Sequence, residues 1–380
     1  MSEKPLRELH ALGQSPWLDF IDRDLIRSGR LAALVEEGVR GVTSNPAIFE
    51  KAIAHSDHYD EEIERCIRSG QEARAIYEAL ALSDVRDAAD ILASVYAESG
   101  GGDGFVSLEV SPGLAHDAEA TVAEGRRLWQ AFDRPNAMIK VPATREGLPA
   151  IRTLLAEGVN VNVTLLFSVA RYREVADAWL AGLEDRAKTQ GSVGEVSSVA
   201  SFFLSRIDTL VDANLDRLAS VGGHGAELAR TLRGRVAIAG ARCAYAAFEE
   251  ILESDRFRRL AASGARPQRL LWASTGTKDP AYPDTKYVDA LVGAHTVTTL
   301  PPATLEAWCD HGRPARERVR EDPKGAVRTL SQLAEIMPPS EIADQLESEG
   351  VRKFVEPFEA LHTAIESKRQ TMLAIGDNPT

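Results

Sequence analysis

Cysteine is scarce in this chain, and its few cysteines form no recognisable motif. Cys66, Cys243 and Cys309 are odd in number and far apart along the 380 residues. This spacing excludes the close cysteine pairs of zinc and redox motifs and offers no framework of disulfides. We therefore expect three reduced thiols without a catalytic role.

Positive charge is also in short supply. Lys and Arg number 44 against 57 Asp and Glu, which gives a net charge of -13. That is the wrong sign for a surface that neutralises nucleic-acid phosphates, so we expect no nucleic-acid partner. A few cations gathered in one pocket can still bind a small phosphorylated molecule, because salt screens distant surface charge.

Long apolar runs and metal-ligand motifs are missing as well. No stretch approaches the roughly 20 apolar residues that span a bilayer, and Met1–Glu8 has no apolar signal core. We expect a cytoplasmic protein without a membrane partner. His55 and His58 are the one close pair of histidines, and no third ligand follows at a zinc-site spacing. The sequence therefore predicts no metal.

What the chain does have is a regular alternation of short β-like runs with longer helical patterns. Its 44% hydrophobic and 27% charged residues are typical of a folded globular protein. The alternation predicts a parallel sheet with helical crossovers, and about eight repeats favour a (β/α)8 TIM barrel of the α/β class over a doubly wound sheet. The expected strands are residues 17–22, 41–45, 105–111, 137–144, 160–167, 196–204, 269–275 and 296–300.

Two stretches add helices to this plan. Residues 56–99 are too long for one crossover, so we expect more than one helix there. The pattern from Arg313 onward is helical and follows the last strand. We expect residues 1–380 to form a single barrel domain, with residues 313–380 as its helical C-terminal extension.

One lysine stands in the middle of an otherwise apolar expected strand. Lys140 lies in residues 137–144, AMIKVPAT. An ammonium group loses hydration when it is buried, and the neutral amine that burial favours is a nucleophile that forms Schiff bases with ketones and aldehydes. The alternative is a structural lysine that pairs with a carboxylate at the strand end. The strand by itself leaves both interpretations open.

Other expected strands also carry polar residues toward their carboxyl ends, where barrel enzymes keep their chemistry. Asn162 and Thr164 share one face of a strand whose other face is apolar, because side chains alternate along a strand. Each polar residue alone could be a hydrogen-bonded group of the barrel interior, but their number indicates a site. The set comprises Asp19, Asn45, Glu109, Lys140, Asn162 and Thr164.

Four of these segments resemble the motifs of transaldolases, in that family's order. They are residues 41–46 (GVTSNP), 106–110 (VSLEV), 138–144 (MIKVPAT) and 160–168 (NVNVTLLFS). The chain most resembles the longer bacterial transaldolases, which belong to the class I Schiff-base aldolases. The resemblance implies a transferase of the pentose phosphate pathway that moves a dihydroxyacetone unit between sugar phosphates and needs no cofactor. Its reaction converts sedoheptulose 7-phosphate and glyceraldehyde 3-phosphate to erythrose 4-phosphate and fructose 6-phosphate.

The resemblance also assigns catalytic roles to particular residues. Lys140 matches the Schiff-base lysine and Asp19 the acid/base aspartate, for which Asp22 is a nearby rival. Glu109 matches the glutamate that holds the catalytic water together with a threonine, here Thr164.

Substrate-binding roles follow in the same way. Asn45 and Asn162 match the asparagines that orient substrate hydroxyls, and Thr43 lies at the same strand end as Asn45. The family's phosphate site matches Ser201 and Arg206, followed by Ser274. Shorter family members have a second arginine after that serine, and this chain has none. Lys278 could replace it or be an ordinary loop lysine.

Two other functions stay open at this stage. A fructose 6-phosphate aldolase shares the Schiff-base barrel, but such enzymes are shorter and lack the glutamate matched by Glu109. A catalytically silent barrel that binds sugar phosphates would be expected to lose Lys140, Asp19 or Glu109, and all three are present. The sequence leaves the oligomeric state open between monomer and homodimer.

Overall fold

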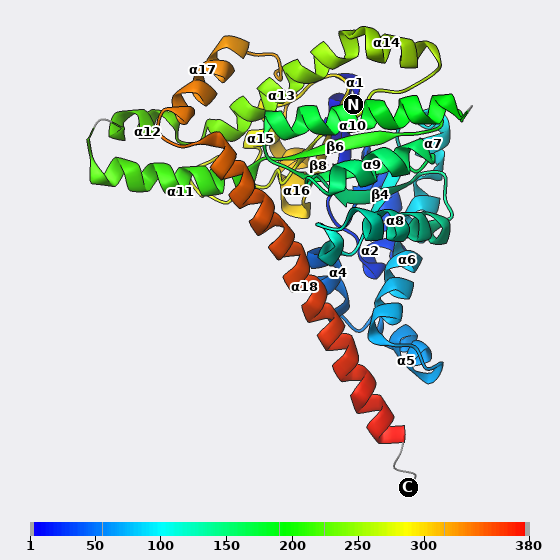
Figure 1. The fold of residues 1–380 in the computed structure, drawn as a ribbon. Helices are drawn as coiled ribbons and strands as arrows, with labels where there is room; N and C mark the ends of the chain where they lie inside the picture. Colours follow the sequence, from blue (N-terminus) through cyan, green and yellow to red (C-terminus); the bar gives the residue numbers. More distant parts are fainter. Residues whose placement is uncertain (1–3, 55, 190, 224, 315, 377–380) are drawn as a thin grey trace.

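The computed structural model describes residues 4–54, 56–189, 191–223, 225–314 and 316–376, with side chains to residue 371. Eight parallel strands form a closed barrel in the chain order β1 to β8 (Figure 1). This confirms the (β/α)8 barrel expected from the alternating pattern. The strands are β1 (Gln14–Leu18), β2 (Gly41–Thr43), β3 (Phe105–Glu109), β4 (Ala137–Pro142), β5 (Val161–Leu166), β6 (Ser198–Phe203), β7 (Arg269–Ala273) and β8 (Thr296–Leu300).

The first strand differs from its expected bounds. It begins at Gln14 and ends at Leu18, whereas residues 17–22 were expected. The strand ends early because the Asp22 carboxylate accepts a hydrogen bond of 2.6 Å from the backbone N–H of Leu25 and so begins a helix. Asp19 follows the strand directly, and its backbone N–H still donates to the carbonyl of Leu300 on β8. Asp19 therefore lies at the carboxyl end of the barrel.

Helices surround the barrel, and residues 56–99 form several of them, as expected. The helices up to β5 are α1 (Pro5–Ala11), α2 (Arg23–Arg27), α3 (Arg30–Glu37), α4 (Pro46–Ala54), α5 (Asp60–Arg68), α6 (Ala73–Ile91), α7 (Ala93–Glu98), the 3-10 turn η1 (Pro112–Leu114), α8 (Ala118–Phe132) and α9 (Gly147–Ala156). Those after β5 are α10 (Val169–Lys188), α11 (Ser205–Val221), α12 (Ala226–Leu232), α13 (Val236–Glu253), α14 (Asp255–Ala262), α15 (Lys286–Ala290), α16 (Pro302–His311), α17 (Pro323–Ala334) and α18 (Pro339–Gly376).

The amino end of the barrel is closed by polar side chains that bond to the backbone. The Asn160 amide donates to the carbonyls of Pro135 and Ala137, and its oxygen accepts from the N–H of Ser197. Nearby, Asp103 is 4% exposed and accepts from the indole N–H of Trp17. These groups are satisfied by their neighbours, so this end of the barrel is structural.

The C-terminal helix α18 crosses the carboxyl side of the barrel. It runs from the neighbourhood of α11, past α4, to the end of α5 (Figure 1). Leu346, Phe354, Leu361 and Ile365 are buried, and their spacing of eight, seven and four residues puts them on one face of the helix. Burial of this face holds α18 against the barrel.

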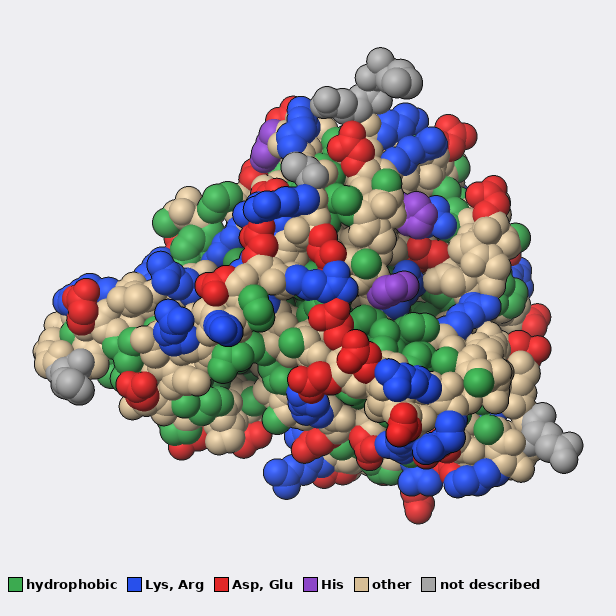
Figure 2. All heavy atoms as spheres, turned by 90° about the horizontal axis from the view of Figure 1, so that it is seen from above, with side chains coloured by type: hydrophobic (Ala, Val, Ile, Leu, Met, Phe, Trp, Pro, Cys, Tyr) green, Lys and Arg blue, Asp and Glu red, His purple; other side chains and the backbone are tan. Residues whose placement is uncertain are grey.

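The surface of the described residues carries charges of both signs. Figure 2 shows basic and acidic side chains interspersed over one face of the molecule. No helix within the described ranges combines the length and the apolar character needed to cross a membrane. The three cysteines are free thiols, as expected, and burial raises the pKa of each.

Candidate active site

A small pocket lies at the carboxyl ends of the strands, where barrel enzymes place their chemistry. Its volume is about 60 Å³. Most of the residues expected from sequence meet here, together with apolar side chains that close its walls. The lining residues are Asp19, Thr43, Asn45, Lys140, Thr164, Ser201, Phe203, Arg206, Leu271, Ala273, Ser274, Thr299 and Phe354.

Lys140 and Glu109 lie side by side because the register of β3 and β4 pairs them. The lysine Nζ is 3.5 Å from Oε2 of Glu109 and donates a hydrogen bond of 2.9 Å to the carbonyl of Ser44. Both side chains are almost buried, at 6% and 5% exposure. Burial raises the pKa of the Glu109 carboxyl, while the positive charges of Lys140 and Arg206 oppose that rise. The pair therefore brings an amine and a proton-exchanging carboxyl within reach of one another.

Two buried oxygens flank Lys140 without hydrogen-bond partners among the described residues. One is Oε2 of Glu109 on β3, and the other is Oγ1 of Thr164 on β5. Thr164 is fully buried and lines the pocket. Buried polar atoms are normally satisfied, so an unsatisfied pair beside a pocket indicates a site for a polar ligand.

Asp19 is oriented by two threonines of neighbouring strands. Oγ1 of Thr43 donates to Oδ1 of Asp19 over 2.7 Å, and Oγ1 of Thr299 lies 2.7 Å from Oγ1 of Thr43. Because the Thr43 hydrogen goes to Asp19, Thr299 is the donor of the second bond. Asp22, the rival candidate, caps α2 instead.

The two asparagines differ in position. Asn45 lines the pocket, and its oxygen accepts from the N–H of Ile48 at the start of α4. Asn162 lies below the pocket at 0% exposure, and its amide bonds Ser107 and Ser201 over 3.0 and 2.7 Å. Asn162 therefore supports the pocket floor through Ser201, which itself lines the pocket.

Arg206 occupies the far side of the pocket, in the first turn of α11. Its guanidinium lies over the rings of Phe203 and Phe354, at 4.9 and 5.3 Å from Cζ to the centroids. Burial lowers its pKa, and Nη1 is buried without a hydrogen-bond partner in the described chain. An arginine held between aromatic rings keeps its donors available for an anion such as phosphate.

Ser274, in the loop after β7, is bonded to Ser205, the first residue of α11 and the neighbour of Arg206 in the chain. Its hydroxyl is 2.7 Å from that of Ser205, and its backbone has the unusual positive φ of 56°. Non-glycine residues rarely adopt this conformation, and such residues cluster at functional sites.

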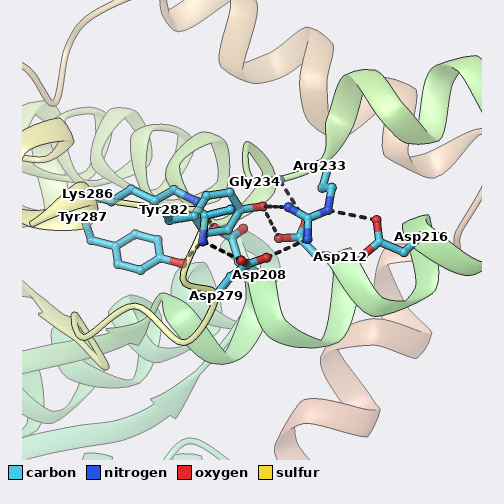
Figure 3. A network of polar contacts seen from close by, with 10 residues as sticks. Asp208, Asp212, Asp216, Arg233, Gly234, Asp279, Tyr282, Lys286 and Tyr287 are labelled. Carbon is cyan, nitrogen blue, oxygen red and sulfur yellow. Dashed lines mark hydrogen bonds and ion pairs between the residues drawn. The ribbon is translucent and has the colours of Figure 1, made fainter. Parts of the chain in front are cut away.

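The structure does not bring Lys278 to this pocket. The lysine is exposed and lines a second cavity of about 230 Å³ beside α11. Contacts of the loop after β7 explain its direction: Tyr282 donates to Asp212, and Arg233 pairs with Asp279 over 2.6 Å (Figure 3). These bonds hold the loop against α11, so the cations that line the pocket among the described residues are Lys140 and Arg206.

Sequence reasoning missed three polar or aromatic residues of the pocket, which are Phe203, Thr299 and Phe354. Thr299 lies on an expected strand, and its place near the carboxyl end was a usable signal. Phe354 comes from α18, and no local pattern distinguishes it from the other apolar residues of that helix face.

The described residues contain no group of three or more His, Cys, Asp or Glu side chains that could hold a metal. Of the histidine pair noted in the sequence, His55 lies outside the described residues.

Comparisons with known proteins show the family to which the chain belongs. A family model described as Transaldolase/Fructose-6-phosphate aldolase matches residues 16–365. The protein named Transaldolase 2 of Nostoc sp. (strain PCC 7120) is 47% identical over 375 residues, which are 97% of this chain and 98% of that protein. The protein named Transaldolase of Thermobifida fusca is 50% identical over 359 residues, covering 94% of this chain and 96% of that protein. The Frankia alni protein of the same name is 48% identical over 359 residues, with 94% and 95% covered. The matched region includes every residue that lines the pocket.

Proposed function

Because the chain belongs to the transaldolase/fructose-6-phosphate aldolase family, we propose that Lys140 forms the Schiff base through which it transfers a dihydroxyacetone unit. The chain is an enzyme of the transaldolase type, a transferase of aldehyde and ketone residues. The remaining steps concern which residues act and how.

The reaction begins with addition of the Lys140 amine to the ketone carbon of fructose 6-phosphate or sedoheptulose 7-phosphate. Loss of water gives a protonated imine, and Glu109 exchanges the protons of that step. The Asp19 carboxylate then takes the proton of the C4 hydroxyl, and the C3–C4 bond breaks. Its electrons form an enamine on Lys140, and the aldose phosphate leaves.

The second half reverses these steps with another aldose phosphate. The enamine carbon C3 attacks the aldehyde, and Asp19 returns its proton to the new hydroxyl. Water, held by Glu109 and Thr164, hydrolyses the imine and restores the amine. The two aldoses are glyceraldehyde 3-phosphate and erythrose 4-phosphate. Because the first aldose leaves before the second one binds, turnover follows a ping-pong scheme.

The single observation that carries the proposal is the buried pair of Lys140 and Glu109, 3.5 Å apart. Besides this ion pair, Oε2 of Glu109 accepts no hydrogen bond from the described residues, which leaves it able to bind a water molecule or a reactant. The proposal also assigns Asn45 to the substrate hydroxyls.

The phosphate end of the substrate is assigned to Arg206, with Ser201 and Ser274 beside it. Support comes from the unpartnered Nη1 of Arg206 and from the pocket that joins it to Lys140. Asn162 acts through Ser201 and Thr43 through Asp19. Lys278 is left out of this assignment.

The wider setting remains a prediction from the sequence. We place the enzyme in the non-oxidative pentose phosphate pathway in the cytoplasm, with sugar phosphates as its partners and no cofactor. Residues 1–380 are proposed as one domain with residues 313–380 as its extension, and its oligomeric state is either monomer or homodimer.

Borohydride trapping tests the proposal. The protein is incubated with fructose 6-phosphate and reduced, and a three-carbon adduct is sought by peptide mass spectrometry. We expect the adduct on Lys140, and none in Lys140→Met, which should fold normally and show no transfer. Lys278→Met is the matched control and should trap as the wild type does. Trapping at another lysine, or substantial transfer by Lys140→Met, would contradict the assignment.

A further inference from the structure

One side chain of the C-terminal extension closes the pocket over both of its cations. Phe354 of α18 is 3% exposed and lines the pocket. Its ring centroid is 5.8 Å from Nζ of Lys140 and 5.3 Å from Cζ of Arg206. In the proposed function these two cations hold opposite ends of the substrate, so Phe354 lies along the substrate between them.

A glycine sets how closely α18 approaches the barrel at this point. Gly350 lies one turn before Phe354 and therefore on the same face of the helix. A Cβ at position 350 would lie 3.0 Å from Cδ2 of Leu165 and 3.4 Å from Cζ of Phe167. Leu165 and Phe167 lie at the rim of β5, and the tips of their side chains would have to shift by a few tenths of an ångström to admit a methyl group. The absence of a side chain at Gly350 lets the helix rest on this rim.

Further contacts fix α18 beyond the pocket. Tyr77 of α6 packs edge-on against Phe358 with centroids 5.4 Å apart, and Phe358 packs on His362 at 4.2 Å. Near its end, Lys368 pairs with Asp60 of α5. The position of Phe354 is therefore set by a helix that is packed along its length.

The closed pocket has a chemical consequence at the enamine stage. A volume of about 60 Å³ corresponds to roughly two water molecules. The enamine on Lys140 can either attack an aldose phosphate or take a proton at C3. Protonation gives the imine of dihydroxyacetone, and one water then adds to its carbon, breaks the C–N bond and releases dihydroxyacetone and the lysine amine. That water balances the one lost when the imine formed, so no other reactant is needed.

We propose that Phe354, seated by Gly350, is a specificity-determining residue that shields the enamine from water and so favours transfer over release of dihydroxyacetone. This inference rests on the proposed function, because it requires the Schiff base on Lys140. It gives the C-terminal extension a direct part in deciding between transaldolase and aldolase chemistry.

The test compares release with transfer in three variants of the full chain. Two rates are measured in parallel. One is the release of dihydroxyacetone from fructose 6-phosphate, and the other is the transfer of the dihydroxyacetone unit from fructose 6-phosphate to erythrose 4-phosphate. We expect Phe354→Ala to raise the ratio of release to transfer about tenfold, because exclusion of water suppresses such side reactions. Phe354→Leu, which refills the space, should restore most of the wild-type ratio. Glu356→Ala changes an exposed residue of the same helix and should leave the ratio unchanged.

Gly350→Ala tests the close contact between α18 and β5 without changing a residue of the pocket. It also keeps the inference testable if Phe354→Ala does not fold. We expect a smaller rise of the ratio in the same direction. An unchanged ratio in folded Phe354→Ala or in Gly350→Ala would overturn the inference, as would equal release by the Leu and Ala variants. Borohydride trapping on wild-type Lys140 separates the two levels: without an adduct the proposed function itself fails.

Discussion

The hydroxyl of Thr43 donates a hydrogen bond of 2.7 Å to the carboxylate of Asp19 and so links the end of β1 to β2. Thr299 of β8 donates to Thr43 in turn, so three strands hold one carboxylate. In the proposed mechanism Asp19 takes the proton of the substrate C4 hydroxyl, and this chain of hydroxyls fixes the orientation of its carboxylate.

Thr43→Val should therefore lower kcat about tenfold while KM changes less than twofold. Valine keeps the shape but removes a hydrogen bond to a charged group, which is worth roughly 1.5 to 3 kcal/mol. Steady-state kinetics with fructose 6-phosphate and erythrose 4-phosphate measure the effect. Thr121→Val removes a buried hydroxyl that bonds Leu114 outside the pocket, and its kcat should be unchanged. Equal loss in both variants would count against an orienting role for Thr43.

The raised pKa of Glu109 predicts how kcat changes at acidic pH. Burial raises the pKa of its carboxyl, so as pH falls the group takes up its proton earlier than an ordinary glutamate with a pKa of about 4.3. The carboxylate is needed to accept protons, so kcat should fall on the acidic side with a midpoint above that value. Glu109→Gln should lower kcat about 100-fold or more and remove this limb.

A half-buried glutamate outside the pocket provides the control for this profile. Burial also raises the pKa of Glu347, which lies on α18 beside Arg171 and outside the pocket. Glu347→Gln should keep the acidic limb of the wild type. If the limb persists in Glu109→Gln, another group sets it.

We predict that substitution of Arg206 weakens binding of the substrate phosphate, whereas substitution of Lys278 does not. Arg206→Gln should raise KM for phosphorylated substrates about tenfold to 100-fold, because it removes charge-assisted hydrogen bonds. KM for unphosphorylated fructose should change little. Lys278→Gln should alter neither value by more than about twofold, since Lys278 lines another cavity. A larger effect at Lys278 than at Arg206 would move the phosphate site to the loop after β7.

The polar network beside α11 predicts an effect on stability (Figure 3). Lys286 pairs with Asp208 over 2.7 Å at 10% and 2% exposure. Lys286→Met leaves that buried carboxylate without its cation and should lower the free energy of unfolding by about 3 kcal/mol. Lys188→Met breaks an exposed pair with Asp185 and should cost less than about 1 kcal/mol. Urea denaturation compares them, and similar losses would show that the buried pair has no special weight.

The barrel and much of its site could be predicted because strand periodicity is a local property. Lys140 and Glu109 stood out as polar residues within their own strands, and their roles were expected from the resemblance to transaldolases. The register of β3 and β4 places the two side chains together. The expected end of β1 was too late in the chain, because residues 17–22 are mostly apolar. The strand stops earlier because the Leu25 N–H donates to Asp22 and begins α2 there.

The positions of Lys278 and Phe354 could not be predicted from the sequence for a different reason. Lys278 follows Ser274 closely in sequence, but the Arg233–Asp279 pair turns the loop away, and that pair joins residues 46 apart. Phe354 lies on the same apolar helix face as Leu346 and Leu361, so the helix pattern does not distinguish it from them. It lies at the pocket because α18 approaches the barrel closely at Gly350. Contacts between distant segments of the chain determine where Lys278 and Phe354 lie, and the periodicity within one segment carries no information about those contacts.

The order in which the ribosome makes the chain gives α18 one more consequence. Synthesis proceeds at about 5 to 20 residues per second, so β8 ends several seconds before Phe354 is added. A nascent barrel can assemble Lys140 and Glu109 during that interval while its mouth is still uncovered. A chain released by a premature stop after Leu300 would keep the reactive amine but lose its cover. Among the residues that line the pocket, its cover is therefore the last to be synthesised.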